Sequence, residues 1–210
     1  MPSAADILKT LETISREWLG LAVAWHILLA MAVMAIILGW RPSRKAGAAV
    51  LVLPLLSVSA LAWLSGNPFN GIVFLLFAIL LALLGLRLPL DRVDPAPVWA
   101  RAAGAVLIAF GWVYPHFLDG GSLLRYLYAA PTGLIPCPTL SVLVGFTLLA
   151  NGFSSRAYSL SLGFLGIFYG AFGAFRLGVR IDLVLFIGSV VLMALAQMMR
   201  SHSQMQTKKS

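Results

Sequence analysis

Charged side chains are scarce in this chain of 210 residues, and acidic ones are the scarcest. Asp, Glu, Lys and Arg make up 10% of it, whereas hydrophobic residues make up 60% and the mean hydropathy is +0.95. A soluble domain carries roughly 25% charged residues, so water could not solvate the surface of this one. The expected solvent is the bilayer, in which only helices and closed barrels pair all their backbone polar groups.

Cysteine is nearly absent, and so are the motifs of several enzyme classes. Cys137 stands alone, so no disulfide can form within the chain. The sequence has no Gly-x-Ser-x-Gly elbow, no Gly-x-x-x-x-Gly-Lys loop, no Cys-x-x-Cys and no His-Glu-x-x-His. Its last apolar run has no lysine for a retinal Schiff base. We therefore expect that the protein is not an enzyme, and we predict no resident cofactor.

An excess of basic residues remains, because 15 Lys and Arg against 7 Asp and Glu give a net charge of +8. Nucleic acid is disfavoured as a partner, since no basic face with interleaved aromatic residues lies outside the apolar runs. Basic loops that obey the positive-inside rule and contact anionic lipid explain the charge better. We expect the lipid bilayer as partner and no nucleic acid, with other membrane subunits as an open alternative.

Long apolar runs without alternation predict an all-α polytopic transmembrane helix bundle of about seven spans. The predicted spans are residues 18–40, 46–65, 69–88, 98–114, 137–153, 157–175 and 181–199. Loops on one side of such a bundle carry ten Lys and Arg, and those on the other side carry five. The positive-inside rule then predicts the N-terminus outside and the C-terminus in the cytoplasm.

Three segments flank or interrupt these spans. Residues 1–17 place four apolar side chains on one helical face and begin with a Ser3-to-Asp6 capping pattern, which predicts an amphipathic interfacial helix. Residues 115–136 have no regular pattern and predict a short interfacial or re-entrant turn. Residues 200–210 predict a disordered basic cytoplasmic tail.

A stripe of small residues runs along one face of the sixth predicted span. Its members recur at spacings of four, three, four and three: Ser159, Gly163, Gly166, Gly170 and Gly173. Helices in lipid associate through close backbone approach, because no hydrophobic force acts between them. The stripe therefore predicts a tight helix contact, with a permeation path as the alternative.

Polar side chains inside or beside the spans are the candidates for function, since each is costly to bury in a membrane. They fall toward the predicted outer side: His26, His116, Asp119, Arg125, Cys137 and Asp182. Imidazole and thiolate suit copper, zinc or iron, so His26, His116 and Cys137 are the candidates for a metal or haem site. The alternatives stay open, because a lone histidine often bonds a neighbouring helix and a lone cysteine often packs as a small hydrophobe.

Four short segments carry a resemblance to a known family. They are residues 41–50, Asn67-Pro68, Tyr114-Pro115 and above all residues 130–139 (APTGLIPCPT), where Cys137 stands between two prolines. In these segments the chain resembles an uncharacterised family of bacterial multi-pass membrane proteins, a domain of unknown function. The resemblance runs from the first span to the last and implies a multi-pass fold in a bacterial inner (plasma) membrane. It implies no activity.

Three functional hypotheses follow. The first is a small-ligand or ion permease, or a binding protein, with an outward-facing site around residues 114–139. The second is a non-catalytic subunit or assembly factor of a larger membrane complex, which could hold a lipid, quinone, haem or pigment. The third is a redox membrane protein that binds a metal or haem.

Overall fold

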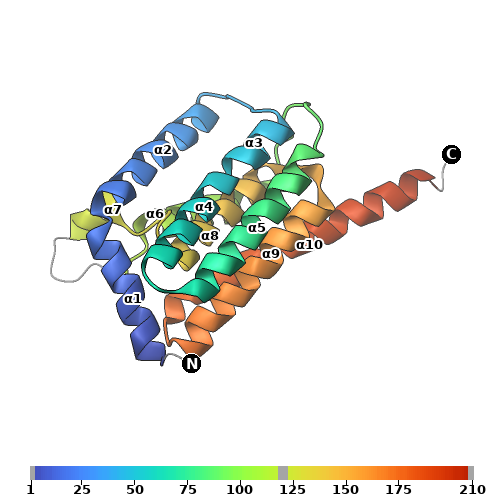
Figure 1. Ribbon diagram of the computed structural model, residues 1–210. Helices are drawn as coiled ribbons and strands as arrows, with labels where there is room; N and C mark the ends of the chain where they lie inside the picture. The colour runs from blue at the N-terminus through green and yellow to red at the C-terminus, as the bar shows by residue number, and fades with distance from the viewer. Residues whose placement is uncertain (1–2, 118–122, 208–210) are drawn as a thin grey trace.

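The protein is all-helical in the computed structural model, which describes residues 3–117 and 123–207. Within these ranges no β-strand forms. Figure 1 shows the helices that these residues form. They are Ala4–Glu17 (α1), Leu19–Ile37 (α2), Arg44–Val50 (α3), Val52–Leu64 (α4), Pro68–Leu86 (α5), Val98–Val113 (α6), Tyr126–Ala129 (α7), Pro136–Leu149 (α8), Arg156–Ala171 (α9) and Leu183–Thr207 (α10).

The all-α prediction is confirmed, and five helices of the described chain are long and apolar enough to cross a membrane. They are Leu19–Ile37, Arg44–Leu64 (α3 and α4 together), Pro68–Leu86, Arg156–Arg176 and Arg180–Met199. Two further apolar helices, α6 and α8, have only 16 and 14 residues. A single helix needs about 20 residues to span the hydrocarbon core, so α6 and α8 are too short to count as candidate spans by length.

Local sequence signals set the helix starts. The Ser3 hydroxyl accepts a hydrogen bond from the Asp6 N–H at 3.2 Å, and the Asp6 carboxylate accepts one from the Ser3 N–H at 3.0 Å. This pair is the capping box that the sequence predicted. Hydrogen bonds from the Ser3 side chain and backbone hold the pKa of Asp6 below its ordinary value. At α5, the Asn67 side chain caps the helix and Pro68 occupies its first turn.

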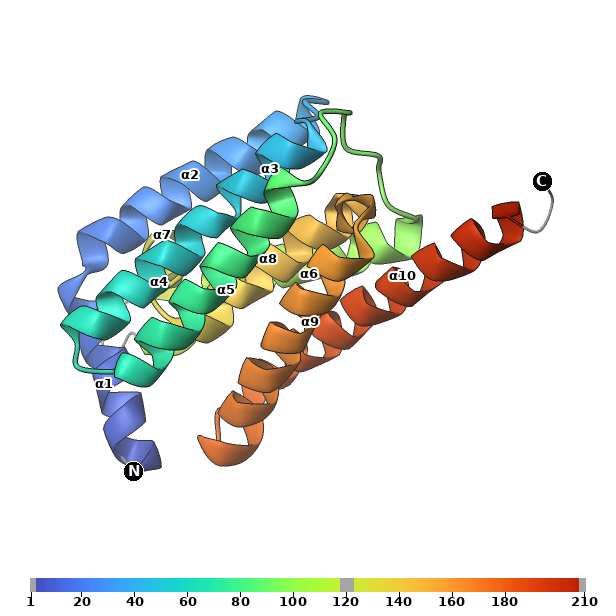
Figure 2. The ribbon, with the colours of Figure 1, turned by 45° about the vertical axis from the view of Figure 1, so that its right-hand side comes forward.

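Helix α8 lies at the centre of the bundle. Eleven of its 14 residues are buried, and it packs against α6, α9 and α10. Figures 1 and 2 show α3, α4 and α5 side by side along one side of α8, and α9 beside α10 along another. This position fits the shortness of α8, because neighbouring helices rather than lipid surround it.

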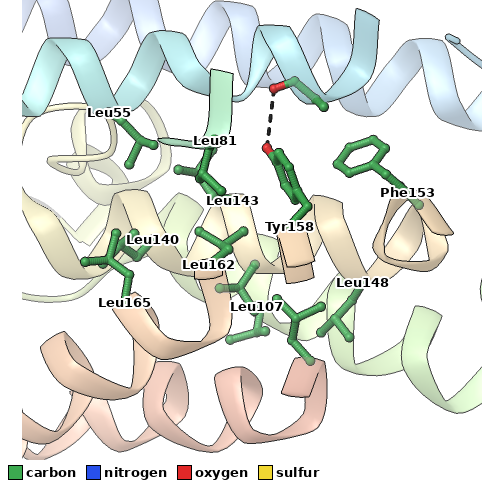
Figure 3. Close-up of a cluster of buried hydrophobic side chains, with 14 of the residues drawn as sticks. Leu55, Leu81, Leu107, Leu140, Leu143, Leu148, Phe153, Tyr158, Leu162 and Leu165 are labelled. Carbon is green, nitrogen blue, oxygen red and sulfur yellow. Dashed lines mark hydrogen bonds between the residues drawn. The ribbon is translucent and has the colours of Figure 1, made fainter. Parts of the chain in front are cut away.

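The largest core cluster joins helices that are far apart in the sequence. Figure 3 shows leucines from α4, α5, α8 and α9 within it, among them Leu55, Leu81 and Leu162. At the edge of this cluster the buried Tyr158 hydroxyl donates a hydrogen bond to the Ala48 carbonyl at 3.3 Å. The polar end of a core tyrosine is therefore satisfied by the backbone of α3.

Glycines permit the closest contact between α6 and α8. Gly104 and Gly145 face each other, and a Cβ added to either would lie 2.7 Å from the carbonyl oxygen of the other. About two turns further along α6, a Cβ on Gly111 would lie 2.6 Å from the Pro138 carbonyl oxygen. The two helix backbones are therefore in direct contact, which is the packing that small residues allow in lipid.

The small-residue stripe of α9 lies against α10. A Cβ on Gly170 would lie 2.6 Å from the Phe186 backbone nitrogen, and one on Gly163 would lie 2.7 Å from Cγ of Met193. Gly166 is also close to Ser189 of α10. The two ends of the stripe lie against other segments: Gly173 against Asp182, just before α10, and Ser159 against Gly152, whose carbonyl accepts the serine hydroxyl at 3.2 Å. The middle of the stripe, from Gly163 to Gly170, therefore forms the contact between α9 and α10.

The loops that follow α2 and α5 pair with each other. The Val93 N–H donates a hydrogen bond to the Pro42 carbonyl at 3.0 Å. A salt bridge joins the Arg44 guanidinium to the Asp94 carboxylate at 2.6 Å. Both loops are therefore held at the same end of the bundle.

The end of α8 differs from the sequence prediction. The span predicted for residues 137–153 ends as a helix at Leu149. Asn151 and Phe153 adopt φ angles of 49° and 54°, in the left-handed region, and a right-handed helix cannot continue through such residues. Hydropathy does not record this backbone turn, because Phe153 is apolar and buried.

The C-terminal segment also differs from the prediction. Helix α10 runs from Leu183 to Thr207, so the expectation of a disordered tail is wrong for residues 200–207. These eight residues contain neither proline nor glycine, the two residue types that most often end a helix. Residues 208–210 lie outside the described part of the chain.

Substitution of Gly170 by alanine tests the α9–α10 contact. The added Cβ would overlap the Phe186 backbone, and such overpacking costs about 1–3 kcal/mol. We expect Gly170→Ala to lower the midpoint of thermal unfolding in detergent by roughly 2 to 12 °C. Gly20→Ala is the control, since no atom lies within 4 Å of its added Cβ, and it should leave the midpoint unchanged or slightly higher. Equal midpoints for the two variants would contradict the contact.

Candidate functional site

Residues 130–135, which we call the connector, are buried although they are not helical. Irregular backbone at membrane depth is tolerated only where the protein itself satisfies its polar groups. Thr139 supplies two of these bonds, because its hydroxyl accepts from the Gly133 N–H at 2.8 Å and donates to the Ile135 carbonyl at 2.6 Å. The Thr132 hydroxyl donates to the Gly111 carbonyl and ties the connector to α6.

Two side chains from the N-terminal helices complete this bonding. The Ser57 hydroxyl of α4 donates to the Gly133 carbonyl at 2.6 Å, and the Trp25 indole N–H of α2 donates to the Ser57 oxygen at 3.1 Å. Gly133 has a φ of 79°, and the Trp25 ring occupies the space that a Cβ would need. Glycine is therefore required here for both its backbone angle and its lack of a side chain.

An apolar cavity of about 400 Å³, which we call the groove, lies between α2, the α3–α4 pair and α8. Figure 1 shows α2 running beside α3 and α4. Leu29 and Ala32 line the groove from α2, Val50 from α3, and Val142 and Phe146 from α8. The walls are therefore aliphatic and aromatic side chains, which are suited to a hydrocarbon chain.

The two ends of the groove differ in polarity. Trp25, Thr132 and Gly133 line one end, where the connector lies, which we call the connector end. At the opposite end Arg41 and Arg101 line the cavity, and both are exposed. No Asp or Glu contributes to the described lining. The groove therefore combines a long apolar interior with a basic end.

A second polar site lies on the other side of the α8 N-terminus. The Tyr114 hydroxyl donates to Asp182 Oδ1 at 2.7 Å, and both residues are buried. Cys137 is close enough to the same carboxyl group to interact with it, and its thiol also points to the Tyr169 carbonyl, 3.9 Å away. We call Tyr114, Cys137 and Asp182 the polar cluster. It joins α6, α8 and the start of the last span.

Tyr169 extends this polar arrangement toward α5. Its hydroxyl donates to Asn70 Oδ1 at 2.8 Å, and both side chains are buried. Its ring meets Phe74 edge to face, with the ring centroids 5.2 Å apart. Each of these two hydroxyl hydrogen bonds, from Tyr114 and Tyr169, joins buried side chains from different parts of the bundle, so the arrangement is a structural link between helices.

His26 does not join the polar cluster. Its Nδ1 lies 2.9 Å from the Ala22 carbonyl oxygen, and its Nε2 lies 2.9 Å from the Trp112 carbonyl oxygen. Both ring nitrogens therefore face carbonyl oxygens and present no lone pair toward a metal. The side chain links α2 to α6, as a lone histidine in a membrane helix commonly does.

Two other predicted candidates, His116 and Arg125, lie in the segments before and after the gap in the described residues. His116 is half-buried and packs its ring against Phe117, with centroids 4.2 Å apart. Arg125 ends a short 3₁₀ turn, Leu123–Arg125, and is half-buried. Asp119 lies outside the described residues. Within residues 3–117 and 123–207 no three His, Cys, Asp or Glu side chains gather as a metal-binding group, so His26, His116 and Cys137 form no ligand set there.

Sequence reasoning missed several residues of these sites. Tyr114 ends the predicted span of residues 98–114 and Arg41 follows the predicted span of residues 18–40, and neither position indicates a site by itself. Ser57 carried a usable signal, because it is a hydroxyl in the middle of an apolar span, where polar groups are costly unless bonded. The pairing of Arg41 with Arg101 carried none, since 60 positions separate them.

A double-mutant cycle tests the Tyr114–Asp182 bond. Asp182→Ala leaves a buried hydroxyl without its acceptor, and Tyr114→Phe leaves the carboxyl without its donor, so each should cost about 1–3 kcal/mol. The double variant should lose clearly less than the sum, as residues in contact do. Thermal unfolding in detergent measures all four proteins. Asp182→Asn keeps an acceptor and should lose less than Asp182→Ala, and strictly additive losses would refute the bond.

Comparison of the chain with models of known protein families, with curated proteins and with solved structures finds no match. The family resemblance suggested by residues 130–139 therefore stays a prediction.

Proposed function

We propose that this protein binds the hydrocarbon chain of a membrane lipid in the groove. The observation that carries the proposal is the cavity of about 400 Å³ between α2, α3–α4 and α8. Ligand sites typically enclose about 300–1,000 Å³ and are lined mostly by apolar side chains. The groove has this size and lining, and its walls include helices long enough to cross a membrane, so a lipid reaches it from the bilayer.

The polar groups near the connector end of the groove favour a lipid over an ion or a polar solute. Gly133 offers its carbonyl to Ser57, while Thr132 and Thr139 give their hydroxyl protons to backbone carbonyls. These groups are already engaged in holding the connector. An ion that entered the groove would leave its hydration shell without gaining replacement ligands. We therefore place the binding site in the groove rather than in an outward mouth around residues 114–139.

The proposal applies equally to a protein that acts alone and to a subunit of a larger complex. Helix α2 packs mainly against α1 and α7, and it forms one whole wall of the groove. A bound chain would fill the space between α2 and the rest of the bundle. Lipid binding is thus the property that the permease and the subunit hypotheses can share.

We also propose that the chain crosses a bacterial inner membrane seven times, with its N-terminus outside. The paired loops after α2 and α5 lie at one end of the bundle. At the other end, α1 packs with Tyr114, Phe117 and the connector. Because successive loops lie at alternate ends of the bundle, α6 and α8 are proposed to cross as well. At about 1.5 Å per residue, they are about 24 and 21 Å long. The connector would complete the crossing of α8.

A filled groove tests the lipid proposal. In Ala32→Phe the new ring occupies the groove, since Ala32 lines it, and co-purifying lipid should fall at least about tenfold. Quantitative lipid extraction and native mass spectrometry of the purified protein measure the loss. Ala30→Phe is the matched control, because Ala30 lies on the same helix, is exposed and does not line the groove. Equal lipid content in both variants would refute the site.

Cysteine labelling tests the topology. A membrane-impermeant maleimide should label Ser65→Cys in intact cells, because the loop after α4 is proposed to lie outside. Leu90 is 76% exposed, and Leu90→Cys should be labelled only after the membrane is opened. The native protein, whose only cysteine is Cys137, measures labelling at that residue. The Cys137→Ser protein measures label that is bound without any cysteine. Labelling of Leu90→Cys in intact cells would overturn the orientation.

A further inference from the structure

We infer that the groove takes an anionic phospholipid from the cytoplasmic leaflet, with Arg41 and Arg101 binding its phosphate. The inference rests on the proposed function and adds to it the chemistry of the head group and the direction of the lipid. The acyl chain would run from the basic end toward Thr132 and Gly133. Nothing in the sequence pattern had marked these two arginines as a pair.

The fold brings the two arginines to one place. Arg41 follows the end of α2, and Arg101 lies in the first turn of α6. Both line the same cavity, together with Pro42 and Pro95. Hydrogen bonds hold this end together, because the Val93 N–H donates to Pro42. The positions of the two arginines are therefore set by paired loops.

The charges at this end are complementary to a phosphate. Arg44 lies three residues after Arg41, but its guanidinium is engaged by Asp94 at 2.6 Å. Neither Arg41 nor Arg101 forms a salt bridge within the described chain, and no acidic side chain lines the described cavity. Two guanidinium groups thus remain to bind a phosphate, which they match with paired N–H donors.

The apolar interior selects a lipid over free phosphate. A soluble anion would use the arginines and leave the remaining groove without an occupant, whereas a phospholipid satisfies both regions. In the proposed topology the basic end faces the cytoplasm, where the leaflet is rich in anionic lipid. Trp40 lines the same end, and tryptophan favours the level of the head groups. The occupant that fits every feature has an anionic head and a long acyl chain.

Native mass spectrometry of the full-length protein tests the inference by titration with dioleoyl phosphatidylglycerol and, separately, dioleoyl phosphatidylcholine. The two lipids share their chains and differ in net charge. We expect tighter binding of the anionic lipid by at least about tenfold, because each arginine near the membrane surface favours it by a factor of about five. In Arg41→Gln/Arg101→Gln this affinity should fall roughly tenfold to thirtyfold, while phosphatidylcholine binding stays close to native.

Arg87→Gln/Arg92→Gln is the matched control, since it removes the same charge from exposed residues of the same loop region that do not line the groove. It should keep the native preference. Equal affinities of the native protein for the two lipids, or an equal loss in the control, would overturn the head-group inference and leave chain binding standing. Saturable binding of inorganic phosphate alone at the two arginines would overturn the lipid as occupant. Failure of both lipids to bind would refute the proposed function itself.

Discussion

The structure depends on one constraint, which is that the buried backbone of the connector must find its hydrogen-bond partners inside the protein. The bilayer offers none, and each unsatisfied group would cost several kcal/mol. At Gly133, the Ser57 hydroxyl donates a hydrogen bond to the carbonyl and the Thr139 hydroxyl accepts one from the N–H. The Trp25 indole N–H donates to the Ser57 oxygen in turn. These bonds fix α2 and α4 against the connector. The connector end of the groove therefore results from the hydrogen bonds that non-helical backbone requires.

The groove itself follows from an uneven distribution of small residues. Gly104 and Gly145 bring α6 and α8 into backbone contact, and the α9 stripe does the same with α10. Helix α2 has no such stripe, and its Gly20 meets no atom within 4 Å at its Cβ position. Larger side chains make its contacts instead, as where Leu29 packs against Ile108 and Val142. A helix that is bonded at Trp25 and His26, and packed beyond them through side chains such as Leu29 without a glycine contact, leaves room for a lipid chain.

The sequence predicted those features that depend on neighbouring positions. The capping box of Ser3 and Asp6 and the stripe that contains Gly170 both rest on spacing within one helix, and helix geometry converts that spacing into contact. The groove could not be predicted, because Ala32 and Val142 come from segments that hydropathy treats separately. For the same reason, charge counts placed His26 and Cys137 on one side of the membrane without showing what each of them touches.

The two prolines around Cys137 have a physical explanation that needs no metal. The first four N–H groups of a helix have no partner within it, and α8 begins where the chain is buried, without a side-chain cap. The Ile135 N–H donates to the Pro131 carbonyl at 3.2 Å, while Pro136 and Pro138 have no N–H at all. Only the N–H of Cys137 then needs a partner. The Pro-Cys-Pro sequence thus lets a helix begin inside the protein, and this buried start separates the groove from the polar cluster.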